Sequence, residues 1–271
     1  MIALDYLAAI RFSGSDAGEF LHNQLSSDVL ALSDHESVFA CYCEPKGRVL
    51  ALLLVCRVDE DYYVIMSSAL ATSVSTRLKM YVMRSKVSIE VLIETTIAGL
   101  REHDDPATAV IPAISFPLTG SAKSLSIVSH DTAINTDASL QDAWKASELD
   151  RGVCWLCPET SSQFLPQMLG FDQLGAVNFR KGCYPGQEIV ARTHYLGKVK
   201  RHPRLLHTVT DICPEPLEKI RISSDDKDYE AIIVDCGRDE NDRICLFVVT
   251  RMDPELTAEQ IEYQGQIWAT M

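Results

Sequence analysis

The sequence predicts an α+β protein that ends in a small antiparallel β-barrel. Helix and hairpin patterns alternate before residue 202, whereas closely spaced strand patterns separated by turns follow Pro203, as is typical of small barrels. The length of 271 residues suggests one to three compact units. We therefore expect an α+β region over 1–202 and a barrel over 203–271. A division of the first region into two subdomains, split near 40–130, is left open.

Local signals place the elements in order. Residues 14–16 are expected to cap a helix that runs through Gln24, and Ser67 or Ser68 to cap the next helix. The turn at 44–47 joins two strands into a hairpin. Three prolines weaken the signal over 95–121, which predicts only short strands and loops. The predicted strands are 8–12, 38–43, 48–58, 62–66, 86–94, 124–129, 205–209, 217–222, 229–235, 244–250 and 262–269, and the other predicted helices are 69–83, 139–149 and 187–193.

Composition and charge exclude several classes of protein. The longest apolar run, 49–56, is strand-sized, so the sequence predicts no membrane span. The first twelve residues lack the basic start and long apolar core of a signal peptide, and we expect a cytoplasmic protein. A net charge of −13 argues against general nucleic-acid binding. The basic residues between Arg180 and Arg204 form either a solvated loop or a docking site for an anionic tail such as a polyglutamate.

Nine cysteines occur in the chain. The odd count and the missing export signal indicate reduced thiols rather than a disulfide scaffold. Cys154-x-x-Cys157 is half of a zinc-binding pattern without a second pair, so we assign no metal ligand. Most other cysteines occur in strand-like runs and are expected in the core: Cys41, Cys43, Cys56, Cys213, Cys236 and Cys245.

One thiol, that of Cys183, stands in a different setting. Glycines flank it on both sides and allow a ligand to approach closely. Pro185 suits the first turn of a helix, and good helix formers follow, so Cys183 is predicted at or just before a helix N-terminus. The amides there, with Arg180 and Lys181 beside them, favour the thiolate. These charged and polar neighbours indicate a reactive thiol more than the alternative, a small buried core residue.

The residues 181–188, Lys-Gly-Cys-Tyr-Pro-Gly-Gln-Glu, followed by Ala191 and Arg192, resemble the signature of the YgfZ-type folate-binding proteins. These are relatives of the glycine cleavage T-protein that act in iron–sulfur cluster assembly or repair. Pro185 departs from the signature, because the family usually has Thr or Val there. The resemblance implies a duplicated ferredoxin-like folate-binding region around a central opening, then a barrel, with tetrahydrofolate or a one-carbon derivative as cofactor. A second family element, at 163–167, is expected to pack beneath the thiol loop.

The same resemblance implies residues for the folate. A pterin needs a carboxylate or amide acceptor in an apolar pocket, and its glutamate tail needs cations. Asp150 falls where the family usually has Glu before Gly; the alternative is a surface acid at a helix end. Gln24 and Asp28 match a Gln-x-x-x-Asp element, although Asp28 suits the cap of the next turn equally well. The other residues expected to contact the cofactor are Tyr81, Arg84, Lys181, Tyr184, Gln187 and the pair Glu188 and Arg192, which share one helix face.

The main functional hypothesis is a folate-binding accessory protein for iron–sulfur enzymes or their assembly factors, with Cys183 as a reactive thiol next to a tetrahydrofolate pocket. The sequence leaves open whether the thiol takes up an adduct or holds a cluster transiently, and whether a reaction is catalysed at all. Effects on tRNA modification would be indirect. The first alternative, an aminomethyltransferase or other one-carbon transferase, is disfavoured because Ala51 and Leu52 stand where the aminomethyltransferase has adjacent aspartates. The second is a thiol oxidoreductase that uses Cys154 and Cys157.

Overall fold

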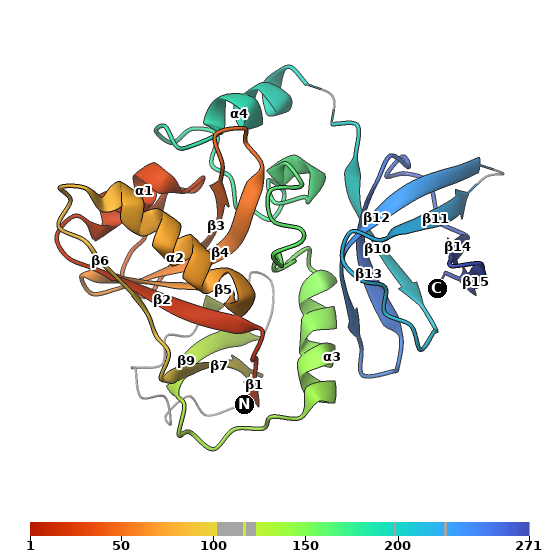
Figure 1. Ribbon diagram of the computed structural model, residues 1–271, viewed down its shortest axis with the longest axis horizontal. Coiled ribbons are helices and arrows are strands. Elements are labelled where there is room, and N and C mark those ends of the chain that lie inside the picture. Colours follow the sequence, from red (N-terminus) through yellow and green to blue (C-terminus); the bar gives the residue numbers. More distant parts are fainter. Residues whose placement is uncertain (102–115, 118–122, 198, 225–226, 271) are drawn as a thin grey trace.

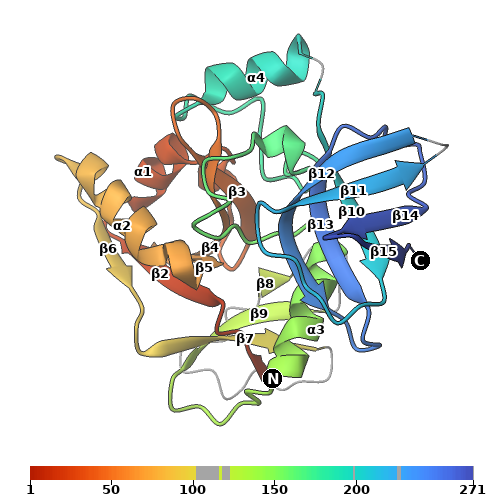
Figure 2. The ribbon, with the colours of Figure 1, turned by 45° about the vertical axis from the view of Figure 1, so that its right-hand side comes forward.

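Three antiparallel sheets make up the protein (Figures 1 and 2). The computed structural model describes residues 1–101, 116–117, 123–197, 199–224 and 227–270. Most of the weak segment 95–121, with its first two prolines, lies outside these residues, as does Lys198 of the basic cluster. Helices and antiparallel sheets are mixed in the part before residue 202 and strands dominate after it, which agrees with the predicted α+β class.

The first sheet has the strand order β3-β4-β5-β2-β6, and the predicted hairpin is present between β3 and β4. Helix α2 packs across it, with α1 alongside (Figure 1). The backbone amide of Val49 donates to Phe164 O at 2.9 Å, which ties the irregular segment after α3 to this sheet. The elements are β2 (Leu7–Ser13), α1 (Ala17–Gln24), β3 (Ser37–Cys43), β4 (Val49–Val58), β5 (Asp61–Ser67), α2 (Ser68–Val82) and β6 (Ser88–Val91).

The second sheet is smaller, with the order β1-β7-β9-β8. Helix α3 lies between this sheet and the C-terminal strands (Figure 1). Its Trp144 lies so close to Gly99 of β7 that a Cβ there would come within 2.9 Å of the indole ring. The elements are β1 (Ile2–Ala3), β7 (Thr95–Leu100), β8 (Phe116–Pro117), β9 (Ser124–Ser129) and α3 (Ala138–Leu149).

The third sheet contains the last six strands described, in the order β10-β13-β12-β11-β14-β15. Among the described residues no backbone pairing closes it into the predicted barrel, although Thr208 Oγ1 of β10 donates to Ala269 O of β15 at 2.9 Å. The predicted single strand 262–269 is wrong: Gln264 and Gly265 both have positive φ and form a tight hairpin turn. The strands are β10 (His202–Thr208), β11 (Lys219–Ser224), β12 (Lys227–Arg238), β13 (Ile244–Thr250), β14 (Gln260–Tyr263) and β15 (Gln266–Ala269).

Two hydrophobic clusters fill the molecule, and β13 belongs to both. Phe247 and Val249 join the large cluster around the first sheet, α3 and the irregular segment. Leu246 and Val248, which point to the opposite face, join a second cluster enclosed by the third sheet. The C-terminal strands therefore have a core of their own and still pack on the body through one face. The division at residue 202 stays a prediction.

Helix positions agree with the predicted ranges, and the predicted N-cap residues of α1 and α2 are confirmed, but neither makes a side-chain cap bond. Asp16 is the N-cap of α1, and its carboxylate accepts a hydrogen bond from Lys86 N at 2.8 Å, in the segment before β6. Ser67 is the residue before α2, yet its side chain makes no cap bond. At α3 Asp137 is the cap, since its carboxylate accepts from Ser139 N at 2.8 Å. No helix in the described residues is long and apolar enough to cross a membrane.

The cysteines correct one prediction. Cys213 and Cys236 form a disulfide, so the thiols are not all reduced. Cys213 lies in an exposed loop rather than in a core strand, and the chain reversal into β12 brings the two Cα atoms to 6.2 Å, within disulfide range. Sequence spacing alone does not reveal such a reversal. The predicted core positions of Cys41, Cys43, Cys56 and Cys245 are confirmed.

Candidate thiol site at the Cys183 loop

Cys183 lies in an irregular loop just before helix α4 (Gln187–Tyr195). It is exposed, and among the free cysteines of the described residues it alone is. Figure 1 shows α4 at the edge of the molecule, beyond the tip of the β3–β4 hairpin. The predicted position before a helix N-terminus and the predicted access to solvent are both confirmed.

A close backbone contact fixes the end of this loop. Gly186 is the N-cap of α4 with φ +84°, and a Cβ there would lie 2.4 Å from Glu44 O and 2.7 Å from Gly47 Cα. Only glycine allows both the conformation and the approach. The hairpin turn at Gly47 therefore supports the thiol loop. Pro185, predicted in the first helical turn, instead precedes this cap.

Lys181 points inward rather than toward solvent. Its ammonium donates to Leu25 O at 2.8 Å and also to His22 O, two carbonyls at the C-terminal end of α1. Burial lowers the pKa of Lys181 to about 8, while the charges of Asp28 and Cys183 act to raise it. The cation predicted to favour a thiolate thus anchors the loop to α1 and still interacts electrostatically with Cys183.

Of the other predicted residues in this segment, two make contacts within the loop and two lie on the protein surface. Tyr184 is buried, with its ring 5.2 Å from the Lys181 ammonium, and burial raises the pKa of its hydroxyl. Gln187 Nε2 donates to Lys181 O at 3.3 Å. Glu188 and Arg192 are exposed, and no ion pair joins them in the described structure. Tyr184 and Gln187 therefore shape the loop, whereas the charged pair is free to meet a ligand or partner.

His22, which no sequence pattern singled out, and Asp28 lie together beside the loop, and Gln24 ends the same helix, α1. His22 Nδ1 lies 3.2 Å from Asp28 Oδ1, and a Cβ on Gly182 would lie 3.7 Å from His22 Nε2. Partial burial and the neighbouring Lys181 lower the pKa of His22, against the charge of Asp28. The buried Oε1 of Gln24 has no hydrogen-bond partner among the described residues.

The element at 163–167 packs beneath α4, as predicted. Gln167 Nε2 donates to Val190 O at 2.8 Å, and Phe164 is buried in the large core. Next to the loop, Phe179 stacks on His194 with ring centroids 3.7 Å apart. The loop and its helix are thus held at both ends and from below, while Cys183 remains accessible.

A cavity of about 610 Å³ opens between α2, the start of β4 and the irregular segment. Tyr81 and Arg84, predicted to line an opening, do not line this cavity and are exposed at the end of α2 and beyond it. Arg77, one turn earlier, lines it instead, and its buried Nε has no partner in the described structure. Five of its other nine lining residues are apolar, among them Leu50, Leu70 and Met80, and four carry hydroxyl groups. One cation at an apolar wall is typical of sites for organic anions.

The chain is similar to known proteins in sequence and in fold. No protein-family model matches the chain. A tRNA-modifying protein YgfZ from Klebsiella pneumoniae strain 342 is 30% identical over 251 residues, which cover 83% of this chain and 77% of that protein. The corresponding protein of Enterobacter sp. strain 638 is 29% identical over 226 residues, covering 74% and 69%. The chain belongs to the YgfZ family.

The fold of this YgfZ-family chain is also similar to that of a glycine cleavage system aminomethyltransferase T from Bartonella henselae. The TM-score is 0.75 at 14% sequence identity, and the match covers 99% of this chain and 83% of that protein. This likeness shows a shared fold. Ala51 and Leu52 stand where the family resemblance implies the two aspartates of the aminomethyltransferase. Both lie in β4, and each is only 1% exposed. Apolar side chains sealed in a strand offer no acid or base.

Two sets of predicted residues lie apart from the Cys183 loop. Asp150 ends α3 at the C-terminal sheet, where its Oδ1 lies 2.8 Å from His207 Nε2. Cys154 is fully buried, and burial raises the pKa of its thiol well above the ordinary value. Cys157 is half-buried and contacts the Thr160 hydroxyl at 3.3 Å. A sealed thiol with a raised pKa is a poor nucleophile, which weakens the oxidoreductase alternative.

Proposed function

We propose that this YgfZ-family protein binds a reduced folate and uses Cys183 as its working thiol in support of iron–sulfur enzymes. The observation that carries the proposal is the exposure of Cys183 on a loop whose neighbours are all held in place. Lys181, Gly186 and Gln187 make structural contacts, so the loop presents the sulfur with little freedom. An accessible, positioned thiol suits a nucleophile or a transient cluster ligand.

The cavity beside α2 is our candidate for the folate. Its volume of about 610 Å³ falls within the usual range of about 300–1,000 Å³ for ligand pockets. Leu50, Leu70 and Met80 would contact the flat ring system, and Arg77 would pair with a carboxylate of the tail. A bound folate would supply a reduced pterin and, when substituted, a one-carbon unit.

Asp150 is the pterin acceptor that the family resemblance implies. In the structure its Oδ1 is engaged by His207 and by the thiol of Cys245, so a paired contact with a pterin requires Asp150 to release them. The role of Asp150 therefore has to be tested separately from that of Arg77. The tRNA modification named for the relatives would, in this proposal, be an indirect effect through cluster-dependent modifying enzymes.

The test separates folate binding from the work of the thiol. Calorimetry with tetrahydrofolate is done on the metal-free protein and on the variants Cys183→Ala, Arg77→Met and Asp150→Ala. We expect Cys183→Ala to bind folate normally, and Arg77→Met to bind at least about tenfold more weakly, as expected for the loss of a charged contact. Weaker binding by Asp150→Ala would assign the pterin contact to that residue.

The role of the thiol is tested by complementation. Variants are expressed in cells that lack the endogenous protein, and the activity of an iron–sulfur-cluster-dependent enzyme is measured. Cys183→Ala should fail to restore it, whereas Cys157→Ala, which removes a half-buried thiol, should restore it fully. Full rescue by Cys183→Ala would refute the thiol role, and the absence of any folate binding by the unaltered protein would refute the cofactor.

A further inference from the structure

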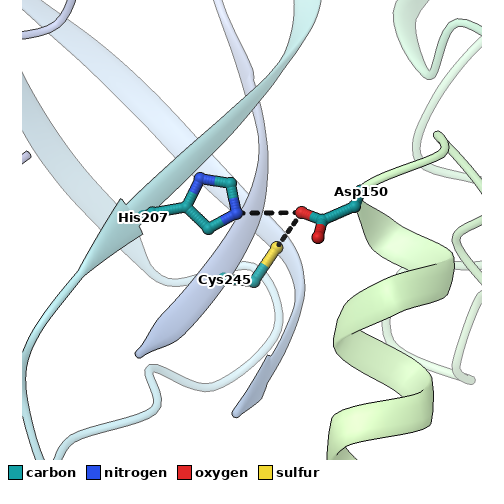
Figure 3. A group of neighbouring side chains, drawn as sticks. All are labelled: Asp150, His207 and Cys245. Carbon is teal, nitrogen blue, oxygen red and sulfur yellow. Dashed lines mark hydrogen bonds and ion pairs between the residues drawn. The ribbon is translucent and has the colours of Figure 1, made fainter. Parts of the chain in front are cut away.

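Three side chains that bind metals well converge where α3 meets the third sheet. Asp150 is the C-cap of α3, His207 lies in β10 and Cys245 in β13 (Figure 3). His207 and Cys245 are direct partners in the β10–β13 ladder, so the sheet sets their spacing. The helix end brings the carboxylate toward both. No part of the thiol loop contributes to this cluster.

One of the distances in this cluster is that of a tetrahedral site, and another is shorter. The Nε2, Sγ and carboxylate oxygen atoms all lie within 4.8 Å of one another. Asp150 Oδ1 is 2.8 Å from His207 Nε2 and 3.5 Å from Cys245 Sγ. Ligands at ordinary zinc bond lengths would be about 3.3 Å apart for N and O and about 3.5 Å apart for S and O. The carboxylate and imidazole would therefore have to separate by about 0.5 Å to admit the ion, and the imidazole and thiol, which lie within 4.8 Å of each other, would both face it.

We propose that Asp150, His207 and Cys245 form a binding site for a zinc-like divalent cation. Thiolate, imidazole and carboxylate are the ligand types that zinc takes, and three protein ligands leave a fourth position for water or substrate, as in catalytic zinc sites. The burial of the three residues is graded: Cys245 is buried, His207 is intermediate and Asp150 is exposed. The fourth position would thus face the exposed side.

A cavity of about 440 Å³ reaches the cluster at Asp150, which helps to line it. Its wall also carries Asp239 and Glu240, together with Arg101 and Lys123. The Cys245 thiol donates a hydrogen bond to Asp150 Oδ1 at 3.5 Å, so the metal-free cluster carries an S–H bond there. Binding replaces that S–H bond by a metal–sulfur bond and releases one proton to solvent, with the metal ion unchanged in oxidation state.

The test uses cobalt(II) as a probe, because a thiolate bound to cobalt gives an intense charge-transfer absorption in the near ultraviolet. The full-length protein should bind one equivalent and show this band. Cys245→Ser should lose the band, and His207→Ala and Asp150→Asn should weaken metal binding by on the order of 100-fold, at least the cost of removing an outer-shell partner. Cys183→Ser and Cys157→Ser are matched thiol controls that should keep the band.

Circular dichroism shows whether each variant is folded. If Cys245→Ser unfolds, His207→Ala still tests the site, because His207 is partly exposed. Zinc should also raise the melting temperature of the unaltered protein but not that of His207→Ala. No charge-transfer band, or a band that Cys183→Ser abolishes, would overturn the proposal. Saturating zinc should weaken folate binding only if Asp150 also contacts the pterin, and each site can be measured without the other ligand.

Discussion

The Cys183 loop and the Asp150–His207–Cys245 cluster hold their thiols in opposite ways. Cys183 is exposed, and the contacts that position it are made by the residues around it in sequence, such as Lys181 and Gly186. Cys245 is buried, and its own sulfur contacts a side chain brought from another element. An accessible thiol on a supported loop suits exchange with changing partners. A buried thiol among converging ligands suits a resident ion.

The largest expected difference between the two regions is in thiol reactivity. Cys183 should be alkylated by iodoacetamide on the order of 1,000-fold faster than Cys245, because Cys245 must wait for a local opening of β13. Peptide mass spectrometry of briefly treated native protein measures both rates, and the half-buried Cys157 should be intermediate. Equal alkylation rates for Cys183 and Cys245 would mean that the C-terminal sheet opens readily. They would contradict the distinction between an accessible and a buried thiol.

This contrast also explains which parts of the molecule the sequence reveals. The thiol loop is contiguous, so glycine positions, a proline and a run of helix formers were enough to predict an exposed Cys183 before a helix. The hairpin around Gly47 follows equally local rules. Strands and helices with strong periodicity, such as β9 and α3, were predicted almost to the residue.

Contacts between residues far apart in the chain could not be predicted in this way, because no local sequence pattern indicates them. Asp150, His207 and Cys245 meet only because β10 pairs with β13 and because α3 packs on that sheet. The Cys213–Cys236 disulfide depends in the same way on a chain reversal. The direction of Lys181 could not be predicted either, since the α1 carbonyls that it binds lie far from it in sequence.

Gly186→Ala should be the most destabilising change in the thiol loop. The left-handed conformation costs a non-glycine residue about 1–2 kcal/mol, and the backbone contacts at 2.4 and 2.7 Å must also open, for about 3 kcal/mol in total. Urea unfolding measures the loss. Gly175→Ala is the matched control, because Gly175 has φ +80° but nothing within 4 Å, so only the conformational cost of about 1 kcal/mol applies. Equal losses for the two variants would show that the hairpin does not fix the loop.

A smaller effect is expected near the cluster, at the buried Glu148 of α3. Its carboxylate accepts from Tyr6, Trp155 and Trp144 at 2.9, 3.0 and 3.2 Å. Burial raises its pKa to about 7, against these three donors. The native state therefore holds this proton more tightly than the unfolded chain, and the stability that the protonated group provides is lost as pH rises from about 4.5 through 7.

Glu148→Gln tests this dependence. Between pH 5 and pH 8 the unaltered protein should lose about 2 kcal/mol of unfolding free energy that Glu148→Gln does not lose. Chemical unfolding followed by tryptophan fluorescence, which reports Trp144 and Trp155 directly, provides the measurement. Glu188→Gln, on the exposed surface of α4, should keep the pH profile of the unaltered protein. A steep profile that survives in Glu148→Gln would place the titrating group elsewhere.

The smallest effect has the opposite sign and belongs to Lys181. Its pKa of about 8 lies below the unfolded value of about 10.4, so the unfolded chain binds the proton more tightly and stability rises between these pH values. After solvent screening we expect a gain of about 1 kcal/mol from pH 7.5 to pH 9.5 that Lys181→Met lacks and the exposed control Lys46→Met retains. Parallel curves for the unaltered protein and Lys181→Met would mean that the ammonium keeps its charge through its bonds to the α1 carbonyls. The loop would then be held to α1 by a permanent cation over the whole range.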